Sequence, residues 1–128
     1  MPQPLPKKIL ARKDEITADF MAAIEKHLDD VVKERVVNMF EIRDFAELLF
    51  IHPTHLSNTI KLTTGHSPCY FVEARIMDIA RDMIQQNIPI NRVAAILTFD
   101  PSNFTKFFKR FQGVTPKQYR ESLYEVVG

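Results

Sequence analysis

The sequence has few of the residues that build disulfide-bonded, strand-rich or membrane-spanning proteins. It contains a single cysteine, Cys69, so no internal disulfide can form, which fits a reducing cytoplasm. No apolar run reaches the roughly 18 residues that a membrane-spanning helix needs. Glycine occurs only three times, and no segment alternates apolar and polar residues as a half-buried strand does. Apolar residues instead recur at helical spacing, which predicts an all-α protein. Because of the lone cysteine and the short apolar runs, we expect this protein in the cytoplasm and not across a membrane.

Charge is nearly balanced, with a formal net charge of +1, but it is unevenly distributed. All 16 acidic residues lie outside two stretches, residues 51–70 and 101–120. Because local positive potential decides where phosphate binds, these stretches are predicted to face a nucleic-acid backbone. A solvated basic face without a partner is the plainer alternative. The cations of the second stretch are Lys106, Lys109, Arg110, Lys117 and Arg120.

The sequence gives little support for catalysis, a metal or a cofactor. One set of residues is spaced like the ligands of a zinc ion: His52, His55, His66 and Cys69. A predicted helix of about 15 Å separates His55 from His66, however, so the four side chains cannot converge on one ion. No glycine-rich phosphate loop and no nucleophile paired with a base occurs. We therefore predict a protein that is not an enzyme and that holds no metal or cofactor.

The chain matches itself without a gap when it is shifted by 48 positions. The match pairs apolar residues, glycines and prolines with one another, which chance rarely does in a single register. It predicts two copies of one supersecondary unit. Representative pairs are Ala46 with Ala94, Pro53 with Pro101, Ile60 with Phe108, Gly65 with Gly113, and Pro68 with Pro116.

Each copy has the pattern of a helix-turn-helix. A first helix, predicted over 42–49 and 90–97, has apolar residues at positions i, i+3, i+4 and i+7. A tight turn follows at 50–52 and 98–100, and proline then begins a second helix that glycine ends. A small alanine in each first helix allows the two helices to approach closely. The second helices are expected to bury Leu56, Thr59, Ile60 and Thr63 in the first copy and Phe104, Phe107, Phe108 and Phe111 in the second.

The outer face of each second helix is predicted to contact DNA. All eight side chains on these two faces can donate a hydrogen bond, and none is acidic. The phenylalanine cluster of the second copy could instead stack on single-stranded bases, but its helical spacing favours a core position. The faces comprise Thr54, Ser57, Asn58 and Lys61 in the first copy and Ser102, Thr105, Lys106 and Lys109 in the second, flanked by His55 and Asn103.

The repeats lie within a larger plan of about seven helices. Further helices are predicted at 17–29 and 116–126. The linker helix between the repeats is about 28 Å long, close to the roughly 34 Å between successive major-groove faces. The predicted segments are a flexible tail at 1–16, a first helix-turn-helix subdomain at 17–67, the linker helix at 68–86 and a second helix-turn-helix subdomain at 87–128.

Residues 99–120, FDPSNFTKFFKRFQGVTPKQYR, resemble the second helix-turn-helix of the AraC/XylS family of transcription regulators. The upstream stretch 74–90, ARIMDIARDMIQQNIPI, resembles that family's linker helix. The resemblance implies two recognition helices that bind an asymmetric site across two major-groove segments. It places base contacts on Thr54, Ser57, Asn58, Ser102, Asn103 and Lys106, and backbone contacts on Lys61, Lys109 and Arg110.

The chain departs from the family pattern at the second turn. Thr98 stands where the family usually has glycine, and the turn after Phe99 is one residue shorter than usual. Both departures bear on the tilt of the second recognition helix. The first recognition helix also lacks an arginine that is common in the family.

Together these observations predict a sequence-specific transcription regulator that binds double-stranded DNA. It is expected to act as a monomer, to contact RNA polymerase and to need no small-molecule effector. The alternative is a helical protein-interaction module that contacts RNA polymerase or another regulator without strong DNA binding of its own. Salt dependence separates the two, because contacts with DNA phosphates release counterions and protein docking depends on salt far less.

Overall fold

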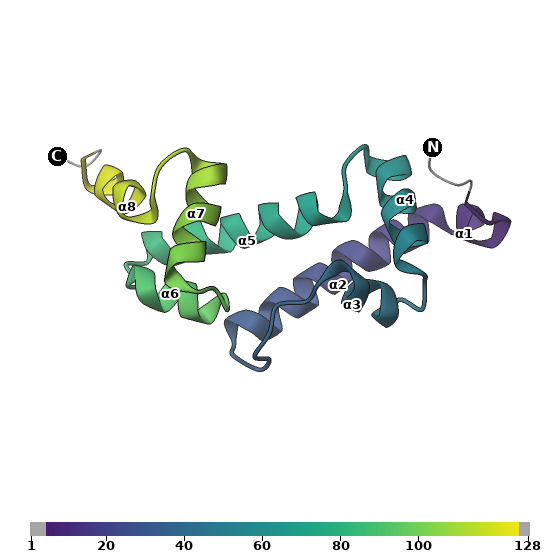
Figure 1. Cartoon of the computed structure of the whole chain (residues 1–128), viewed down its shortest axis with the longest axis horizontal. Coiled ribbons are helices and arrows are strands. Elements are labelled where there is room, and N and C mark those ends of the chain that lie inside the picture. The colour runs from purple at the N-terminus through teal and green to yellow at the C-terminus, as the bar shows by residue number, and fades with distance from the viewer. Residues whose placement is uncertain (1–4, 126–128) are drawn as a thin grey trace. The chain divides into compact units, whose positions relative to one another are not determined.

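The computed structural model of the chain describes residues 5–125, and these residues form eight α-helices and no strand (Figure 1). The predicted all-α fold is therefore confirmed. The additional helix beyond the seven expected is a short one near the N-terminus. The helices are α1 (Lys7–Ala11), α2 (Lys13–Val32), α3 (Ile42–Leu48), α4 (Pro53–Thr64), α5 (Pro68–Gln85), α6 (Ile90–Ile96), α7 (Pro101–Gln112) and α8 (Pro116–Glu125).

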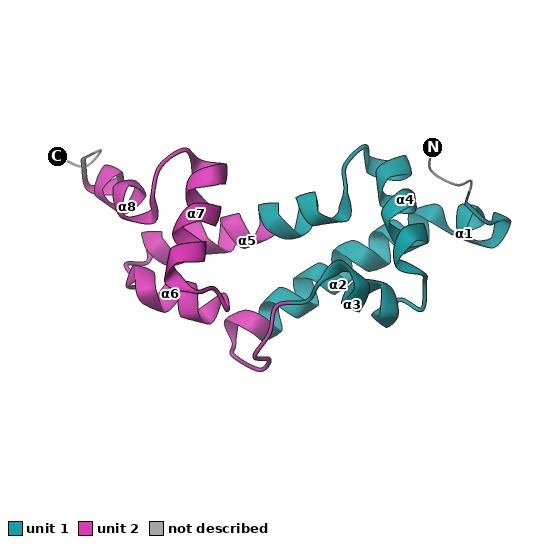
Figure 2. Cartoon of the chain, in the orientation of Figure 1, with its two compact units in different colours: residues 1–30, 40–74 teal, residues 31–39, 75–128 magenta. Residues whose placement is uncertain are grey.

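The chain divides into two compact units (Figure 2). Unit 1 comprises the described residues up to Asp30 together with Phe40–Ala74, and unit 2 comprises Val31–Met39 together with the described residues from Arg75 onward. Each unit contains one of the predicted repeats, since α3 and α4 lie in unit 1 and α6 and α7 in unit 2. The linker helix α5 begins in unit 1 and ends in unit 2.

The N-terminal segment differs from the flexible tail expected at 1–16. Residues 1–4 lie outside the described part of the chain, but α1 follows soon after them, and α2 already begins at Lys13. Pro6 precedes α1, and its carbonyl accepts the Leu10 N–H at 2.9 Å. The sequence did not reveal α1 because this helix buries none of its side chains and so has no apolar stripe.

The core of unit 1 is formed by the apolar stripe of α2 and the facing sides of α3 and α4. Phe20 and Phe45 are fully buried, and their rings meet edge to face with centroids 5.6 Å apart. Ala46 is also fully buried, and its small side chain lets the contacting helices α3 and α4 approach closely. Full burial of a large apolar side chain contributes about 1.5–3 kcal/mol. The other buried apolar side chains are Ile16, Ala23, Ile24, Leu28, Leu56, Ile60 and Val72.

A histidine, His27 of α2, lies inside this core. Its Nε2 accepts the backbone N–H of Phe40 at 2.9 Å, so the imidazole is neutral and carries its proton on Nδ1. The ring stacks on Phe40 with centroids 3.8 Å apart, and Phe45 packs edge-on against it. Burial lowers the pKa of His27 below its ordinary value of 6.5, and the opposing influence of Asp30 and Asp44 is smaller.

The core of unit 2 repeats this plan around α7. Ala94 of α6 is buried where α6 contacts α7, and Phe104 and Phe108 are fully buried on the inner side of α7. Tyr119 of α8 packs against Phe108 with ring centroids 5.5 Å apart. Residue 126, the predicted end of this last helix, lies outside the described residues. The other buried apolar side chains are Val31, Ile76, Met77, Ala80, Met83, Ile84, Val93, Leu97 and Phe107.

Two residues expected in the core are less buried than predicted. Phe111 is 44% exposed, so the prediction of its burial is wrong. It lies in the last turn of α7, where the helix leaves the core, and the guanidinium carbon of Arg110 lies 4.9 Å from its ring centroid. Thr63 is half-buried, and its hydroxyl forms a 2.7 Å hydrogen bond with the hydroxyl of Thr17, which ties α4 to α2.

We predict that the free energy of unfolding decreases as the pH falls from about 7.5 to about 5.5. Because the pKa of His27 is lowered in the folded protein, the unfolded chain binds more protons below its own value of 6.5. The stability contributed by neutral His27 is complete above that pH and is lost as the pH falls toward the folded pKa. His27→Gln does not titrate, so its unfolding midpoint in urea should depend less on pH over this range. Equal pH dependence in the two proteins would contradict the assignment.

Candidate nucleic-acid interface

The turn between the two helices is closed by the same hydrogen bond in both units. In unit 1 the Ile51 N–H donates to the Ala46 carbonyl at 3.0 Å, and in unit 2 the Phe99 N–H donates to the Ala94 carbonyl at 2.8 Å. Such a bond, from the second residue beyond the helix C-cap to a carbonyl in the last turn, is typical of a Schellman motif. The shared bond fixes where the second helix of each unit begins.

The motif requires one residue in the left-handed conformation, and neither unit uses glycine there. Phe50 has a φ of +57° and Thr98 a φ of +65°. Non-glycine residues adopt this conformation at a cost of roughly 1–2 kcal/mol. Thr98 therefore takes up a backbone conformation that glycine, the residue expected here from the family resemblance, adopts more easily. The side chain of Phe50 is 97% exposed, so the core does not compensate for its strain.

Helix α4 is fixed at both ends. His52 precedes it, and its Nδ1 accepts the Thr54 N–H at 3.1 Å, while Pro53 occupies the first helical position. Gly65 ends the helix with a φ of +81°, and its N–H donates to the Lys61 carbonyl at 2.9 Å. The predicted start and end of this helix are both confirmed.

Helix α7 has the same ends with a different cap. The carboxylate of Asp100 accepts the N–H groups of Ser102 and Asn103 at 3.1 and 3.4 Å, and Gly113 ends the helix with a φ of +85°. In the 48-residue register, Asp100 corresponds to His52. The spacing of His52 resembles that of a zinc ligand, whereas the structure uses this residue as a helix cap. Its register with an aspartate, a common cap residue, was the sequence signal for that role.

The outer face of α4 brings together the five residues predicted to contact DNA in the first copy. Thr54 and Lys61 are exposed, whereas His55, Ser57 and Asn58 are half-buried. Hydroxyl and amide groups can bond to base edges, and the single ammonium group can bond to phosphate. This face is therefore equipped mainly with neutral donors.

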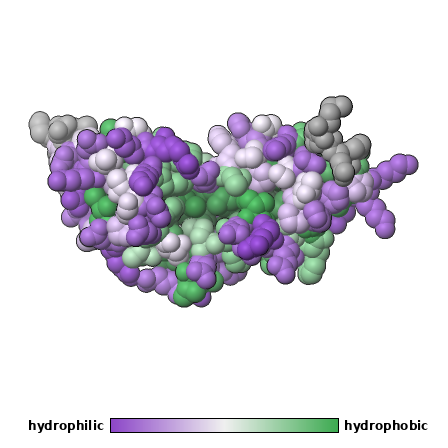
Figure 3. All heavy atoms as spheres, in the orientation of Figure 1, coloured by the Kyte–Doolittle hydropathy of each residue, from purple (hydrophilic) through white to green (hydrophobic). Residues whose placement is uncertain are grey.

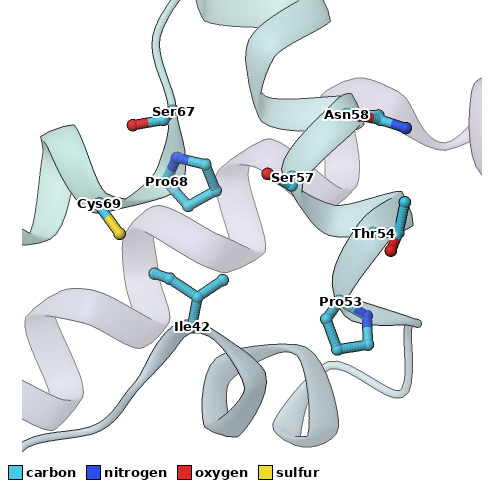
Figure 4. A pocket seen from close by; sticks show the side chains of 8 residues that line it. All are labelled: Ile42, Pro53, Thr54, Ser57, Asn58, Ser67, Pro68 and Cys69. Atoms are coloured by element: carbon cyan, nitrogen blue, oxygen red, sulfur yellow. The ribbon is translucent and has the colours of Figure 1, made fainter. Parts of the chain in front are cut away.

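A shallow groove of about 410 Å³ runs along one side of this face (Figure 4). Ser57 points across the groove toward Pro68 at the start of α5, and Thr54 and Asn58 lie along its rim on α4 (Figure 4). The start of α5 accordingly lies beside the outer face of α4. The groove is lined by Ile42, Pro53, Thr54, Ser57, Asn58, Ser67, Pro68 and Cys69.

The outer face of α7 is more basic than that of α4. The guanidinium carbon of Arg110 lies 5.8 Å from the ring centroid of Phe107 and 4.9 Å from that of Phe111, which orients this cation by cation–π contact. Figure 3 shows hydrophilic residues over much of the visible surface of α7 and α8. The predicted contact residues all lie on this helix: Ser102, Asn103, Lys106, Lys109 and Arg110 are exposed, and Thr105 is half-buried.

The histidines and the cysteine do not form a ligand cluster in the part of the chain that the structure describes. His52 and His55 lie side by side with ring centroids 5.6 Å apart, while His66 stacks on Tyr70 at 4.0 Å. Among residues 5–125, no group of three or more His, Cys, Asp or Glu side chains is arranged to hold a metal ion. No helix within the same residues is long and apolar enough to cross a bilayer.

Two helix-turn-helix units in one register, each with a polar outer face on its second helix, define a duplicated helix-turn-helix protein. Residues 45–122, more than half of the chain, match the protein family described as "Helix-turn-helix domain". The chain belongs to the AraC-type helix-turn-helix family of DNA-binding transcription regulators. The resemblance found at residues 99–120 is thereby confirmed.

Two curated relatives carry names of the same kind. The uncharacterized HTH-type transcriptional regulator YobQ of Bacillus subtilis is 33% identical over 85 residues, which cover 65% of this chain and 35% of YobQ. The probable transcriptional regulator LumQ of Photobacterium leiognathi is 21% identical over 95 residues, which cover 73% of this chain and 38% of LumQ. The chain thus spans little more than a third of the length of these relatives.

Solved structures share the fold. The C-terminal domain of AraT, a response regulator from Geobacillus stearothermophilus, matches with a TM-score of 0.72 and 27% identity over 84% of both chains. A DNA-binding transcriptional dual regulator from Escherichia coli K-12 matches with a TM-score of 0.68 over 98% of this chain and 97% of the other. At 18% identity, this second likeness concerns the fold alone.

We predict that Thr98→Gly stabilises the protein, because glycine adopts the left-handed conformation of the second turn without strain. The expected gain is about 1 kcal/mol, with a rise of a few degrees in the melting temperature. Thr98→Ala is the matched control, since it removes the same hydroxyl and γ-methyl groups but keeps the Cβ that causes the strain. Equal melting temperatures for the glycine and alanine variants would show that this turn is not strained.

Proposed function

We propose that the chain recognises a specific site in double-stranded DNA by inserting α4 and α7 into two adjacent major-groove segments. A single chain then supplies both recognition helices, and the two half-elements of the site need not be related by symmetry. The proposed contacts are Thr54, His55, Ser57, Asn58 and Lys61 from α4, and Ser102, Asn103, Thr105, Lys106, Lys109 and Arg110 from α7.

The observation that carries this proposal is the composition of the two outer faces. Both consist of hydrogen-bond donors without a carboxylate, on helices whose opposite sides are buried in a core. Among them, the amide of Asn58 matches the paired acceptor and donor of adenine, and the ammonium group of Lys106 matches the two acceptors of guanine. We therefore propose Asn58 and Lys106 as the principal residues that contact base edges.

The two faces would contribute in different ways. The outer face of α4 has one cation, Lys61, whereas that of α7 has Lys106, Lys109 and Arg110. Because phosphate contacts dominate affinity, α7 would supply the larger share of binding strength, and α4 would act mainly through neutral hydrogen bonds.

The oligomeric state, the location and a second partner of the regulator follow from the same proposal. With both recognition helices on one chain, a monomer suffices to occupy the whole site. A role in transcription at chromosomal DNA implies the cytoplasm as its location and RNA polymerase as a second partner. No acid–base or nucleophilic step is assigned to any residue.

Selection of bound sites from a random duplex pool tests the proposal. The selected duplexes should share two unlike elements about one helical turn apart, roughly 10 base pairs from centre to centre. Affinity for this site should fall with salt at a log–log slope near −5 if about six phosphates are contacted. No enriched motif, together with a shallow salt dependence, would favour the protein-interaction module instead.

We predict that Lys106→Ala weakens binding to the selected site by roughly 1–3 kcal/mol and relaxes the preference at one base pair. Lys26→Ala is the control, because it removes the same charge from α2, where Lys26 pairs with Asp30 at 2.9 Å. Binding constants for duplexes with each base at each position distinguish the two variants. A loss that is uniform over all sequences would reassign Lys106 to the phosphate backbone.

A further inference from the structure

The short helix α1 brings positive charge to the recognition helix of unit 1. α1 has five residues, none of them buried, and it contacts α4. Its first two residues, Lys7 and Lys8, are both exposed. The helix lies outside residues 45–122, the stretch that matches the helix-turn-helix family.

Lys7 and Lys8 differ from the cations that follow them in the chain. Arg12 pairs with Glu15 and Lys13 pairs with Asp14, each at 3.3 Å. Lys7 and Lys8 have no carboxylate partner among the described residues 5–125. Their charges are therefore available to a ligand outside the chain, beside a recognition helix whose own outer face carries a single cation.

The connection between α1 and the rest of unit 1 holds helix α1 against α4. α2 begins two residues after α1 ends, and the Thr17 hydroxyl in its early turns bonds to the Thr63 hydroxyl of α4 at 2.7 Å. The Arg12 N–H also donates to the Ile9 carbonyl at 3.0 Å, which closes the end of α1. A backbone that is already ordered loses less conformational entropy on binding than a free tail does.

We propose that Lys7 and Lys8 bind DNA phosphates that flank the half-element contacted by α4, and thereby supply the charge that α4 lacks. The inference rests on the proposed function, since it assigns a further part of the same DNA interface. It names the sugar–phosphate backbone as the ligand, so these lysines add affinity without adding sequence preference.

The test compares the salt dependence of Lys7→Ala/Lys8→Ala with that of the unaltered chain on the selected duplex. Each lost phosphate contact should make the log–log slope shallower by about 0.9, so the double variant should lose about 1.8. Base preference should be unchanged. In ethylation interference, ethylation of the phosphates that flank the α4 half-element should weaken binding of the unaltered chain but not of the double variant. Ethylation around the α7 half-element should weaken binding of both proteins equally.

Two controls separate contact from net charge. Lys7→Arg/Lys8→Arg keeps both charges and should keep the slope, whereas Lys26→Ala/Lys33→Ala removes two charges elsewhere and should leave the interference pattern intact. The inference is overturned if the alanine variant of α1 behaves like the Lys26/Lys33 control while Lys106→Ala still weakens binding. If the unaltered chain binds no duplex with steep salt dependence, the proposed function fails, and this inference fails with it.

Discussion

Each unit depends on one close helix crossing, at Ala46 in unit 1 and at Ala94 in unit 2. Both alanines are buried between the two helices of the motif, and the carbonyl of each also accepts the hydrogen bond that closes the turn. A larger side chain at this position would push the helices apart and move that carbonyl away from its donor. Helix packing and turn geometry are therefore set by the same residue, and the direction of the second helix follows from both.

The surface that each unit offers is a product of how its second helix begins and ends. Proline and a side-chain cap set the first turn of α4 and α7, and a left-handed glycine stops each helix after 12 residues. The polar side chains between these limits are thus displayed in the same register twice. The chemistry displayed differs, since the outer face of α4 has one cation and that of α7 has three. The duplicated scaffold therefore presents two different surfaces.

The sequence predicted those features that local backbone chemistry determines. The start and end of α4 could be predicted because Pro53 and Gly65 determine the backbone conformation at their own positions, independently of the neighbouring helices. The exposure of Phe111 was not predictable from helical spacing, since coverage of the last turn of α7 depends on how far the neighbouring helices extend. Similarly, Ser57 is half-buried because the start of α5 lies beside α4, and periodicity within α4 contains no information about another helix.

The unlike caps of α4 and α7 differ in how much of the first turn each one holds. The imidazole of His52 accepts a single backbone N–H, that of Thr54. The carboxylate of Asp100 accepts two, those of Ser102 and Asn103. Because an N–H group without a partner at a helix start is left to solvent, the first turn of α4 should fray more readily than that of α7.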